Sequence, residues 1–275
     1  MEVLYGLHPV EEAVRSGARR LDCVLLARER GDARLERLAR LCRDASVRVT
    51  LESRDQLTRM SRTDAHQGAV ALVRERAFLT IEDLLTAPPA TKNSDISSEE
   101  TQPAHRFFLA LDGIEDPHNL GALLRTADGA GVDGVLLPER RSAPVSATVA
   151  KTSAGASEHV RIARVTNLVR ALEQMKQANV WALGLDERGT PDYTAFDFRT
   201  DCVLVLGREG AGLHDLVKKT CDHLLRIPMA GAVSSLNVSV AGAVVMYEAM
   251  RQRSQPAQPA TKPAAPAKPR KGLGS

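Results

Sequence analysis

The 275-residue sequence has few aromatic side chains and few cysteines, and these shortages exclude several classes of protein. Aromatic residues make up 3% of the chain, so platforms for stacking nucleic-acid bases are few. No run of about 18 apolar residues occurs, which excludes a membrane-spanning helix. The cysteines contain no Cys-x-x-Cys pair and no Cys/His cluster with zinc spacing: Cys23, Cys42, Cys202 and Cys221. We therefore expect reduced, packed cysteines and no metal.

The N-terminus lacks both a basic region and an apolar signal core, so we expect a cytoplasmic protein. Lysine is also missing from residues 1–77, although arginine is abundant there. The formal net charge is only +3, so the total charge does not indicate a nucleic-acid partner. Arginine makes forked contacts with phosphate, which favours RNA, whereas a solvated Arg-rich surface is the plain alternative. Charge alone leaves both interpretations open.

Residues 1–77 alternate between helical and strand-like patterns. A helix is expected from His8, with Gly17 as its stop, and Ser53 is a plausible N-cap of a second helix. Leu35, Leu38 and Cys42 fall at helical spacing. The apolar runs that read as strands are residues 21–27, 47–51 and 68–73. This pattern predicts a small N-terminal α/β domain.

The segment that follows is polar and rich in proline and serine, above all over residues 86–104. Such a composition cannot bury enough apolar surface to offset the entropy lost on ordering. We therefore predict a flexible linker over residues 78–105, with a short capped helix at residues 80–85. The Pro/Ala/Lys-rich stretch 254–275 predicts a disordered basic tail.

Residues 106–253 predict a second, larger α/β domain. Short apolar runs alternate with helical patterns, which is typical of a mostly parallel sheet with helices on both faces. The strands are expected at residues 107–111, 134–137, 160–163, 180–185 and 202–206. The helices are expected at residues 120–130, 145–154, 167–178, 213–220 and 238–252. Ligands of such sheets bind beyond the C-terminal ends of the strands.

One loop at such a strand end is Leu206-Gly207-Arg208-Glu209-Gly210-Ala211-Gly212-Leu213. It lacks the lysine of a P-loop, and it follows a late strand, unlike a dinucleotide fingerprint. Glu209 would repel a phosphate, so a ligand with a positive centre fits better. The alternative is a tight turn in which Glu209 is solvated or caps the next helix.

A second loop, residues 227–239, consists mostly of small residues and carries no charge. It precedes an apolar run with a helical pattern, Val240 to Met246. A small, uncharged loop against a buried helix is typical of a pocket wall, where backbone groups reach the ligand. Asn237 and Ser239 are its candidates for orienting chemistry.

A third segment runs from a strand end at Asp112 into a helix near Asn119, which could cap that helix. Arg125 follows within the same helix among small and apolar neighbours. A guanidinium in such surroundings requires an acidic or phosphate partner. A surface arginine is the alternative.

These three segments resemble the three sequence motifs of the SpoU branch of the SPOUT RNA 2′-O-ribose methyltransferases. The matching stretches are Asn119-Leu120-Gly121-x-x-x-Arg125, Leu206-Gly207-x-Glu209-x-x-Gly212-Leu213, and Ile227-Pro228-Met229 with Ser234-x-Leu236-Asn237-Val238-Ser239. The first domain, with Tyr5-Gly6-Leu7-His8-Pro9-Val10 and His66-Gln67-Gly68, resembles a ribosomal-protein-like RNA-binding domain. The layout is most similar to the 23S rRNA guanosine-2′-O-methyltransferase subgroup.

The resemblance implies an S-adenosyl-L-methionine (SAM) site built by a trefoil knot, and a homodimer that completes the site across its interface. It implies that Arg125 activates the ribose hydroxyl, while Asn119, Glu209, Asn237 and Ser239 complete the catalytic set. It places the cofactor against backbone groups around Gly207, Ile227 and Leu236. No metal is implied.

Two other functions remain open from the sequence. The first keeps the chemistry and changes the substrate to tRNA. The second is a non-catalytic RNA-binding or ribosome-assembly factor on a degenerate methyltransferase scaffold. The intact motif residues argue against the second function.

Overall fold

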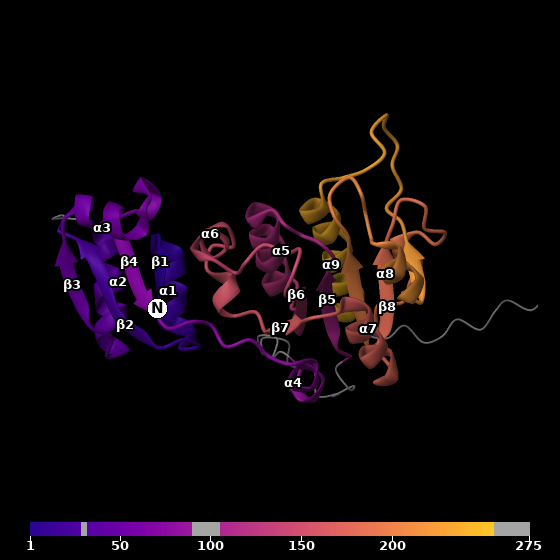
Figure 1. The fold of residues 1–275 in the computed structure, drawn as a ribbon, viewed down its shortest axis with the longest axis horizontal. Helices are drawn as coiled ribbons and strands as arrows, with labels where there is room; N and C mark the ends of the chain where they lie inside the picture. Colours follow the sequence, from indigo (N-terminus) through magenta and orange to yellow (C-terminus); the bar gives the residue numbers. More distant parts are fainter. Residues whose placement is uncertain (29–31, 90–104, 256–275) are drawn as a thin grey trace, which may run out of the picture.

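The computed structural model describes residues 1–28, 32–89 and 105–255. The described chain forms two α/β units that lie beside each other along an elongated molecule (Figure 1). Residues 90–104 of the predicted linker and 256–275 of the predicted tail lie outside the described residues. Among the described residues, no helix is both long and apolar enough to cross a membrane.

The N-terminal unit is built on a four-stranded sheet with strand order β1-β4-β2-β3. The strands are β1 (Glu2–Tyr5), β2 (Leu21–Ala27), β3 (Val49–Glu52) and β4 (Ala69–Val73). β4 runs antiparallel to β1 and β2, whereas β2 and β3 are parallel. The sequence pattern predicts the last three strands but not β1.

Its helices are α1 (Leu7–Ser16), α2 (Ala33–Asp44) and α3 (Arg54–Ser61), with a short 3₁₀ turn η1 (Asp64–His66). Gly17 ends α1 in the left-handed region at φ 59°, as expected of a glycine stop. The Ser53 hydroxyl accepts a hydrogen bond from the Gln56 amide and caps α3. Both capping predictions are confirmed.

The first part of the predicted linker is packed structure. Leu79 pairs with Ala163, and α4 (Ile81–Thr86) follows with a reciprocal capping box between Thr80 and Asp83. Leu84 is buried against the larger unit. The short capped helix is confirmed, but a flexible linker beginning at residue 78 is wrong. Ile81 and Leu84 are buried in a core of the larger unit and Leu79 packs against it, so apolar burial fastens this segment.

The larger unit contains six strands, all parallel, in the order β10-β8-β9-β5-β6-β7. They are β5 (Phe107–Leu111), β6 (Gly134–Pro138), β7 (Ile162–Val165), β8 (Trp181–Leu185), β9 (Cys202–Leu206) and β10 (His223–Leu225). β7 lies two residues later than the predicted strand. β10 was not predicted, because three residues carry no periodic signal.

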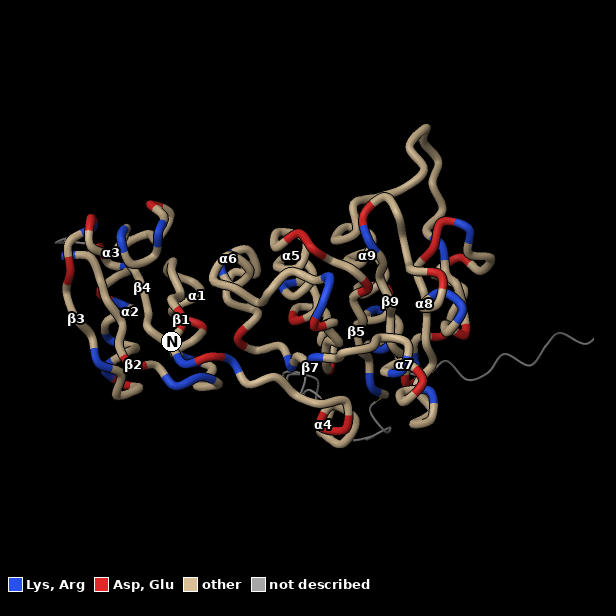
Figure 2. Tube along the Cα trace, in the orientation of Figure 1, with Lys and Arg blue, Asp and Glu red and all other residues tan. Residues whose placement is uncertain are grey.

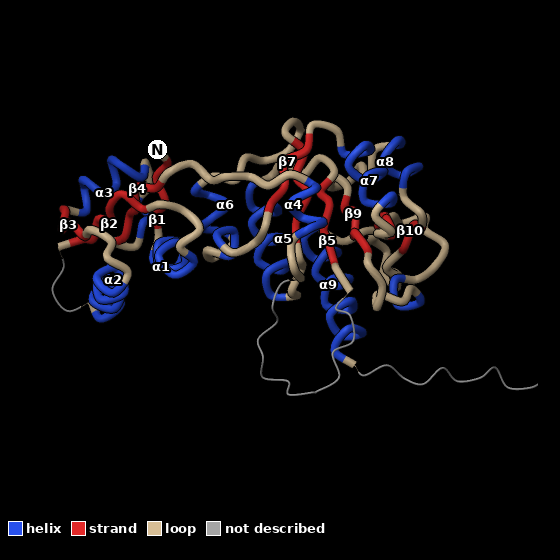
Figure 3. The backbone as a smooth tube through the Cα atoms, turned by 90° about the horizontal axis from the view of Figure 1, so that it is seen from below, coloured by secondary structure: helices blue, strands red, loops and turns tan. Residues whose placement is uncertain are grey.

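Helices cover both faces of this sheet (Figure 3). They are α5 (Pro117–Gly129), α6 (Ala147–Thr152), α7 (Leu168–Gln177), α8 (Asp215–Thr220) and α9 (Val238–Ser254), with 3₁₀ turns η2 (Ala156–Glu158) and η3 (Tyr193–Ala195). α5 and α9 lie on one face, and α4, α7 and α8 on the other. Phe107 and Leu109 of β5 pack in the core between the sheet and α5 and α9, whereas Phe108 packs in the core on the opposite face, under α4, α7 and α8.

The strand order places β5 and β9 side by side in the middle of the sheet. From β5 the chain moves outward through β6 and β7, and it returns to the other side through β8 and β9. The ends of β5 and β9 are joined where the Asp112 amide donates to the Leu206 carbonyl at 2.8 Å. A reversal of this kind is where parallel sheets bind ligands.

Candidate functional site

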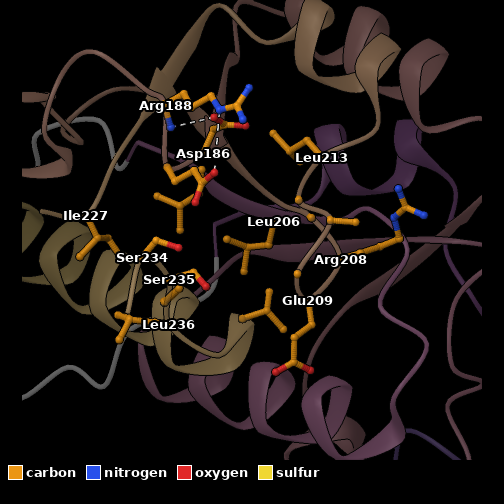
Figure 4. A pocket seen from close by; sticks show the side chains of 18 of the residues that line it. Asp186, Arg188, Leu206, Arg208, Glu209, Leu213, Ile227, Ser234, Ser235 and Leu236 are labelled. Atoms are coloured by element: carbon orange, nitrogen blue, oxygen red, sulfur yellow. Dashed lines mark hydrogen bonds and ion pairs between the residues drawn. The ribbon is translucent and has the colours of Figure 1, made fainter. Parts of the chain in front are cut away.

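A cavity of about 530 Å³ opens at the C-terminal ends of β8, β9 and β10. Its wall includes all three residues that the sequence predicts for the cofactor, Gly207, Ile227 and Leu236. Figure 4 shows Ile227, Ser234 and Leu236 on one side and Glu209 on the other. This volume lies within the usual range for small-molecule sites, roughly 300–1,000 Å³.

Gly207 begins a tight loop that leaves no room for a side chain. Arg208 and Gly212 exchange backbone hydrogen bonds of 3.0 and 2.9 Å, which folds the loop back on itself. A Cβ on Gly207 would lie 2.2 Å from the Gly212 carbonyl carbon and 2.3 Å from the Leu213 nitrogen. Both neighbours are backbone atoms, so they cannot move aside cheaply. Glycine is therefore required here by close backbone approach.

Four of the predicted catalytic residues form one hydrogen-bonded network beside the cavity. The side-chain amide of Asn119 donates to the Glu209 carboxylate at 3.2 Å. The side-chain amide of Asn237 donates to the Glu209 carboxylate and to Asn119 Oδ1, each at 3.0 Å. The Ser239 hydroxyl donates to the Asn237 side-chain oxygen at 2.6 Å. Segments distant in sequence thus meet at the ends of β5 and β9.

The network corrects one prediction. Asn119 does not cap its helix: Asp116 is the N-cap, its carboxylate accepts from the His118 amide at 2.9 Å, and Pro117 occupies the first turn. The Asn119 side chain is therefore free to bind Glu209. Asn237 is the true cap of α9, because its oxygen also accepts from the Ser239 amide at 2.9 Å.

Arg125 lies apart from this network within the chain. It is exposed on α5, and it forms no ion pair or hydrogen bond among residues 1–28, 32–89 and 105–255. Six residues separate it from Asn119, which is about 9 Å along the helix and about one and two-thirds turns around it. Within the described part of one chain, no hydrogen bond or ion pair joins Arg125 to Glu209, Asn237 or Ser239, and its catalytic role stays a prediction.

Asp186, at the end of β8, is a cavity residue that the sequence analysis missed. One of its oxygens binds Lys218 of α8 at 2.7 Å, and the other accepts from the Arg188 amide at 2.9 Å. Burial raises the pKa of Asp186, but the bonds from Lys218 and Arg188 outweigh it and leave the pKa below its usual value. Its position directly after a buried strand is the sequence feature that could have indicated a cavity residue.

A second carboxylate, that of Asp112, follows β5 directly. It accepts from the His214 amide at 2.7 Å and binds His214 Nδ1 at 2.8 Å. Asp112 is buried, and this clamp ties the end of β5 to the start of α8. No group of three His, Cys, Asp or Glu side chains in the described part of the chain could hold a metal ion.

Residues 228–237, between β10 and α9, carry no charge and are exposed. They form a projecting loop, drawn in tan in Figure 2. Ser234, Ser235 and Leu236 of this loop line the cavity.

The cysteines are free: three are buried, and Cys221 is half-buried. Burial raises the pKa of Cys202 to about 12, so its thiol is unreactive.

Both units match known families. Residues 106–247 match the family model described as "SpoU rRNA Methylase family". Residues 3–79 match the model described as "RNA 2′-O ribose methyltransferase substrate binding". The larger match covers more than half of the chain.

Curated relatives and solved structures agree with these matches. The chain is 39% identical to the 23S rRNA (guanosine-2′-O-)-methyltransferase RlmB of Ralstonia nicotianae, over 92% of this chain and 96% of the relative. It is 39% identical to the enzyme of the same name from Escherichia coli K12, over 92% and 99%. The SpoU methyltransferase AviRb from Streptomyces viridochromogenes in complex with AdoMet superposes with a TM-score of 0.72, at 25% identity, over 91% of this chain and 90% of that one.

Proposed function

This chain belongs to the SpoU rRNA methylase family of SAM-dependent RNA 2′-O-ribose methyltransferases, and we propose that its target is a guanosine of 23S rRNA. The observation that carries the proposal is the convergence of three distant segments on one cavity. Residues 119–125, 206–213 and 227–239 meet where β5 and β9 end. The relatives named for this substrate span almost the whole chain.

The cavity suits the methyl donor in size and chemistry. Its volume of about 530 Å³ accommodates an adenosine with a short amino-acid chain. Backbone groups around Gly207, Ile227 and Leu236 are proposed to hold the adenine and ribose, because all three residues line the cavity. SAM, when bound, supplies a methyl group on a positively charged sulfur. The carboxylate of Glu209 favours such a ligand near the cavity.

The proposed role of Arg125 follows from its charge and its free guanidinium. Arginine stays protonated at neutral pH, so it is a poor proton acceptor. We assign it to the phosphate beside the target ribose and to the negative charge that develops on the 2′-oxygen. The hydroxyl proton then leaves through phosphate or water. Asn119, Glu209, Asn237 and Ser239 orient the ribose and fix the loop around it.

A homodimer would bring the Arg125 of one copy to the network of the other. In support, α9 exposes a stripe of large apolar side chains at helical spacing, Val240, Tyr247 and Met250. α5, which carries Arg125, packs beside α9 on the same face of the sheet. Such a face on a chain of this size is typical of an interface. The trefoil knot stays a prediction.

RNA selection is assigned to residues 1–77. Arg40, Arg43 and Arg48 lie at the end of α2 and in the turn after it, and all are exposed. None forms an ion pair within the described ranges, so these guanidinium groups are available to phosphates. Binding governed by phosphate contacts weakens steeply as salt rises.

The test is a map of ribose methylation in rRNA and tRNA from cells with and without the gene. The proposal predicts that one guanosine of 23S rRNA loses its 2′-O-methyl group. Loss of a mark in tRNA would retain the chemistry and move the substrate. If neither RNA loses a mark, the enzymatic function itself is contradicted.

A further inference from the structure

The two units of the chain are packed together rather than merely connected. Ala150 of α6 in the larger unit is buried within the core of the N-terminal unit. Gly155, just after α6, lies against α1 so closely that a Cβ there would be 2.7 Å from Glu12 Cβ and Cγ. Backbone of one unit thus touches a helix of the other.

A buried ionic cluster lies in this contact. The Glu158 side chain, in η2 of the larger unit, is 0% exposed. Arg19 Nε approaches it at 3.0 Å and Arg76 Nη2 at 3.3 Å. Arg19 also pairs with Glu2 of β1. Two arginines from the N-terminal side therefore converge on one carboxylate of the methyltransferase unit.

The cluster is balanced only as a whole. Arg19 and Arg76 supply two positive charges, and Glu158 and Glu2 supply two negative charges. Burial, together with the neighbouring Arg19, lowers the pKa of Arg76, although Glu158 opposes this effect. Without the Glu158 charge, two largely buried arginines would face each other with only the partly exposed Glu2 as counterion.

Backbone contacts add direction to the cluster. Arg76 donates to the carbonyl oxygens of Ser157 and Val160, which hold η2 and the turn after it. At the rim, Lys151 of α6 donates to the Ala65 carbonyl at 2.6 Å. These bonds cross between the units in both directions. They define one orientation rather than a loose apolar contact.

The contact continues to the catalytic network. α6 packs on α5 at Gly121, where a Cβ would be 2.6 Å from Thr152 Cβ and 3.1 Å from the Ser153 nitrogen. The same helix carries Asn119 in its first turn. A close-packed path therefore connects Glu158 through α6 and α5 to the site. Close-packed interiors are hardly compressible, so a shift at one end of this path is passed on to the other.

We propose that Glu158 is a positioning residue that holds the RNA-binding unit at a fixed distance and angle from the methyl-donor cavity. Removing one partner of a buried ion pair leaves the other charge uncompensated, so loss of the Glu158 carboxylate should loosen this contact between the units. If the proposed function holds, the preferred substrate is a folded RNA. In such an RNA the element bound by the N-terminal unit lies at a fixed distance from the target ribose. A short single strand cannot use this fixed distance and is methylated poorly.

The test compares Glu158→Gln with Glu173→Gln in the full chain. Glu173 is exposed on α7 and forms no ion pair within the described parts of the chain, so it is a matched control. Small-angle scattering should show a larger radius of gyration for Glu158→Gln only. Its kcat/KM on a folded 23S rRNA fragment should fall on the order of 10-fold to 100-fold. Its activity on a short single strand and its calorimetric affinity for SAM should stay within about 2-fold of the wild-type values.

A second variant keeps the proposal testable if Glu158→Gln misfolds. Glu158→Gln with Arg76→Gln removes one charge of each sign, so the double variant should recover compactness and part of the folded-RNA activity. Equal scattering and equal RNA kinetics for Glu158→Gln and Glu173→Gln would overturn the inference. Scattering does not require RNA, so inactivity of the wild-type enzyme on every RNA would contradict the proposed function and leave this arm intact.

Discussion

The two edges of the six-stranded sheet are built in opposite ways. At the closed edge, where the strands begin, Asp201 binds Arg106 through its backbone nitrogen at 2.9 Å and its guanidinium at 2.8 Å. Asp133 accepts from the Phe107 amide at 2.6 Å, and Arg253 donates to the carbonyl oxygens of Arg106 and Thr200. At the open edge, where the strands end, the loops offer glycine, serine and backbone groups to a cavity.

The comparison shows how one sheet separates stability from function. Charged groups at the closed edge find partners within the chain, which fixes the strand starts. At the open edge Gly207 lines the cavity within a tight loop, and Arg125 on the neighbouring helix has no partner in the described chain. Residues with unmet bonding capacity are those available to a ligand. Variants at the two edges should therefore change different observables.

The largest effect is expected at Arg125. Arg125→Ala should lower the single-turnover rate of methyl transfer by roughly 10²–10³-fold, because a charge acting on the developing oxyanion is lost. The calorimetric affinity for SAM should stay within about 2-fold, since Arg125 does not line the cavity. Arg125→Lys keeps the charge but not the forked geometry, so it should recover only part of the rate. Loss of SAM binding would instead make Arg125 part of the pocket.

The next effect is expected at Asn119. Asn119→Ala leaves Glu209 and Asn237 with one partner fewer, at a cost of about 1–3 kcal/mol, or roughly 10-fold to 100-fold in kcat/KM. The matched control is Asn167→Ala, which removes the cap of α7 outside the cavity. That control should lower the stability by about 1 kcal/mol and leave the rate unchanged. Equal rates for both variants would show that the network has no part in catalysis.

A smaller effect, on stability alone, is expected at the closed edge. Burial raises the pKa of Asp201, but its bonds with Arg106 and His105 outweigh burial and hold the pKa below its usual value. A lowered folded-state pKa stabilises the fold above the unfolded pKa, and this stability is lost as pH falls through the folded value. Asp201→Asn should therefore lower the melting temperature at pH 7 by about 2–8 °C, for a loss of about 1–2 kcal/mol.

That loss should shrink as pH falls below the usual carboxyl pKa and through the lowered pKa of the folded state, where the wild-type carboxylate becomes protonated. The affinity for SAM and the rate of methyl transfer should match those of the wild type. A rate defect in the folded Asp201→Asn variant would break the division between the two edges.

The smallest effect is expected at Asp128, near the end of α5. Its side chain keeps contact with solvent, but partial desolvation raises its pKa and Glu12 adds to the increase, although His159 opposes it. A raised carboxylate pKa means that ionisation weakens the fold, and this penalty shrinks as pH falls through the folded-state pKa and disappears below the unfolded-state pKa. Asp128→Asn should slightly raise the melting temperature at pH 7, with no difference at pH 3. A lower melting temperature at pH 7 would show that the charge is useful there.

The sequence predicted those parts of the fold that local pattern controls. Ser53, Thr80 and Gly17 act on backbone groups within a few residues, so their effects could be read without tertiary knowledge. The parallel sheet followed from apolar runs separated by helical patterns. The Asp116-Pro117 pair also marked a helix start, and taking Asn119 as the cap overlooked the preference of proline for the first turn.

Other features depend on contacts that no local pattern contains. The Asp186–Lys218 and Asp112–His214 pairs join residues on different elements, and either partner alone resembles an ordinary polar residue. β1 and β10, which the sequence analysis missed, each pair with a neighbouring strand that is distant in the sequence, β4 and β8. The resemblance indicated which site residues belong together, but it did not show that Arg125 stands apart from them within one chain.

The most direct test of the open edge as the methyl-donor site is calorimetric titration of SAM into three full-length proteins. They are the wild type, Gly207→Ala and Gly231→Ala. Gly231 lies in the loop that covers the cavity, and a Cβ there meets nothing within 4 Å, so its substitution is the matched control. The account predicts that the wild type and Gly231→Ala bind SAM equally, whereas Gly207→Ala loses at least about 100-fold in affinity, or about 2.7 kcal/mol. Wild-type affinity in Gly207→Ala, or no binding by the wild type, would contradict it.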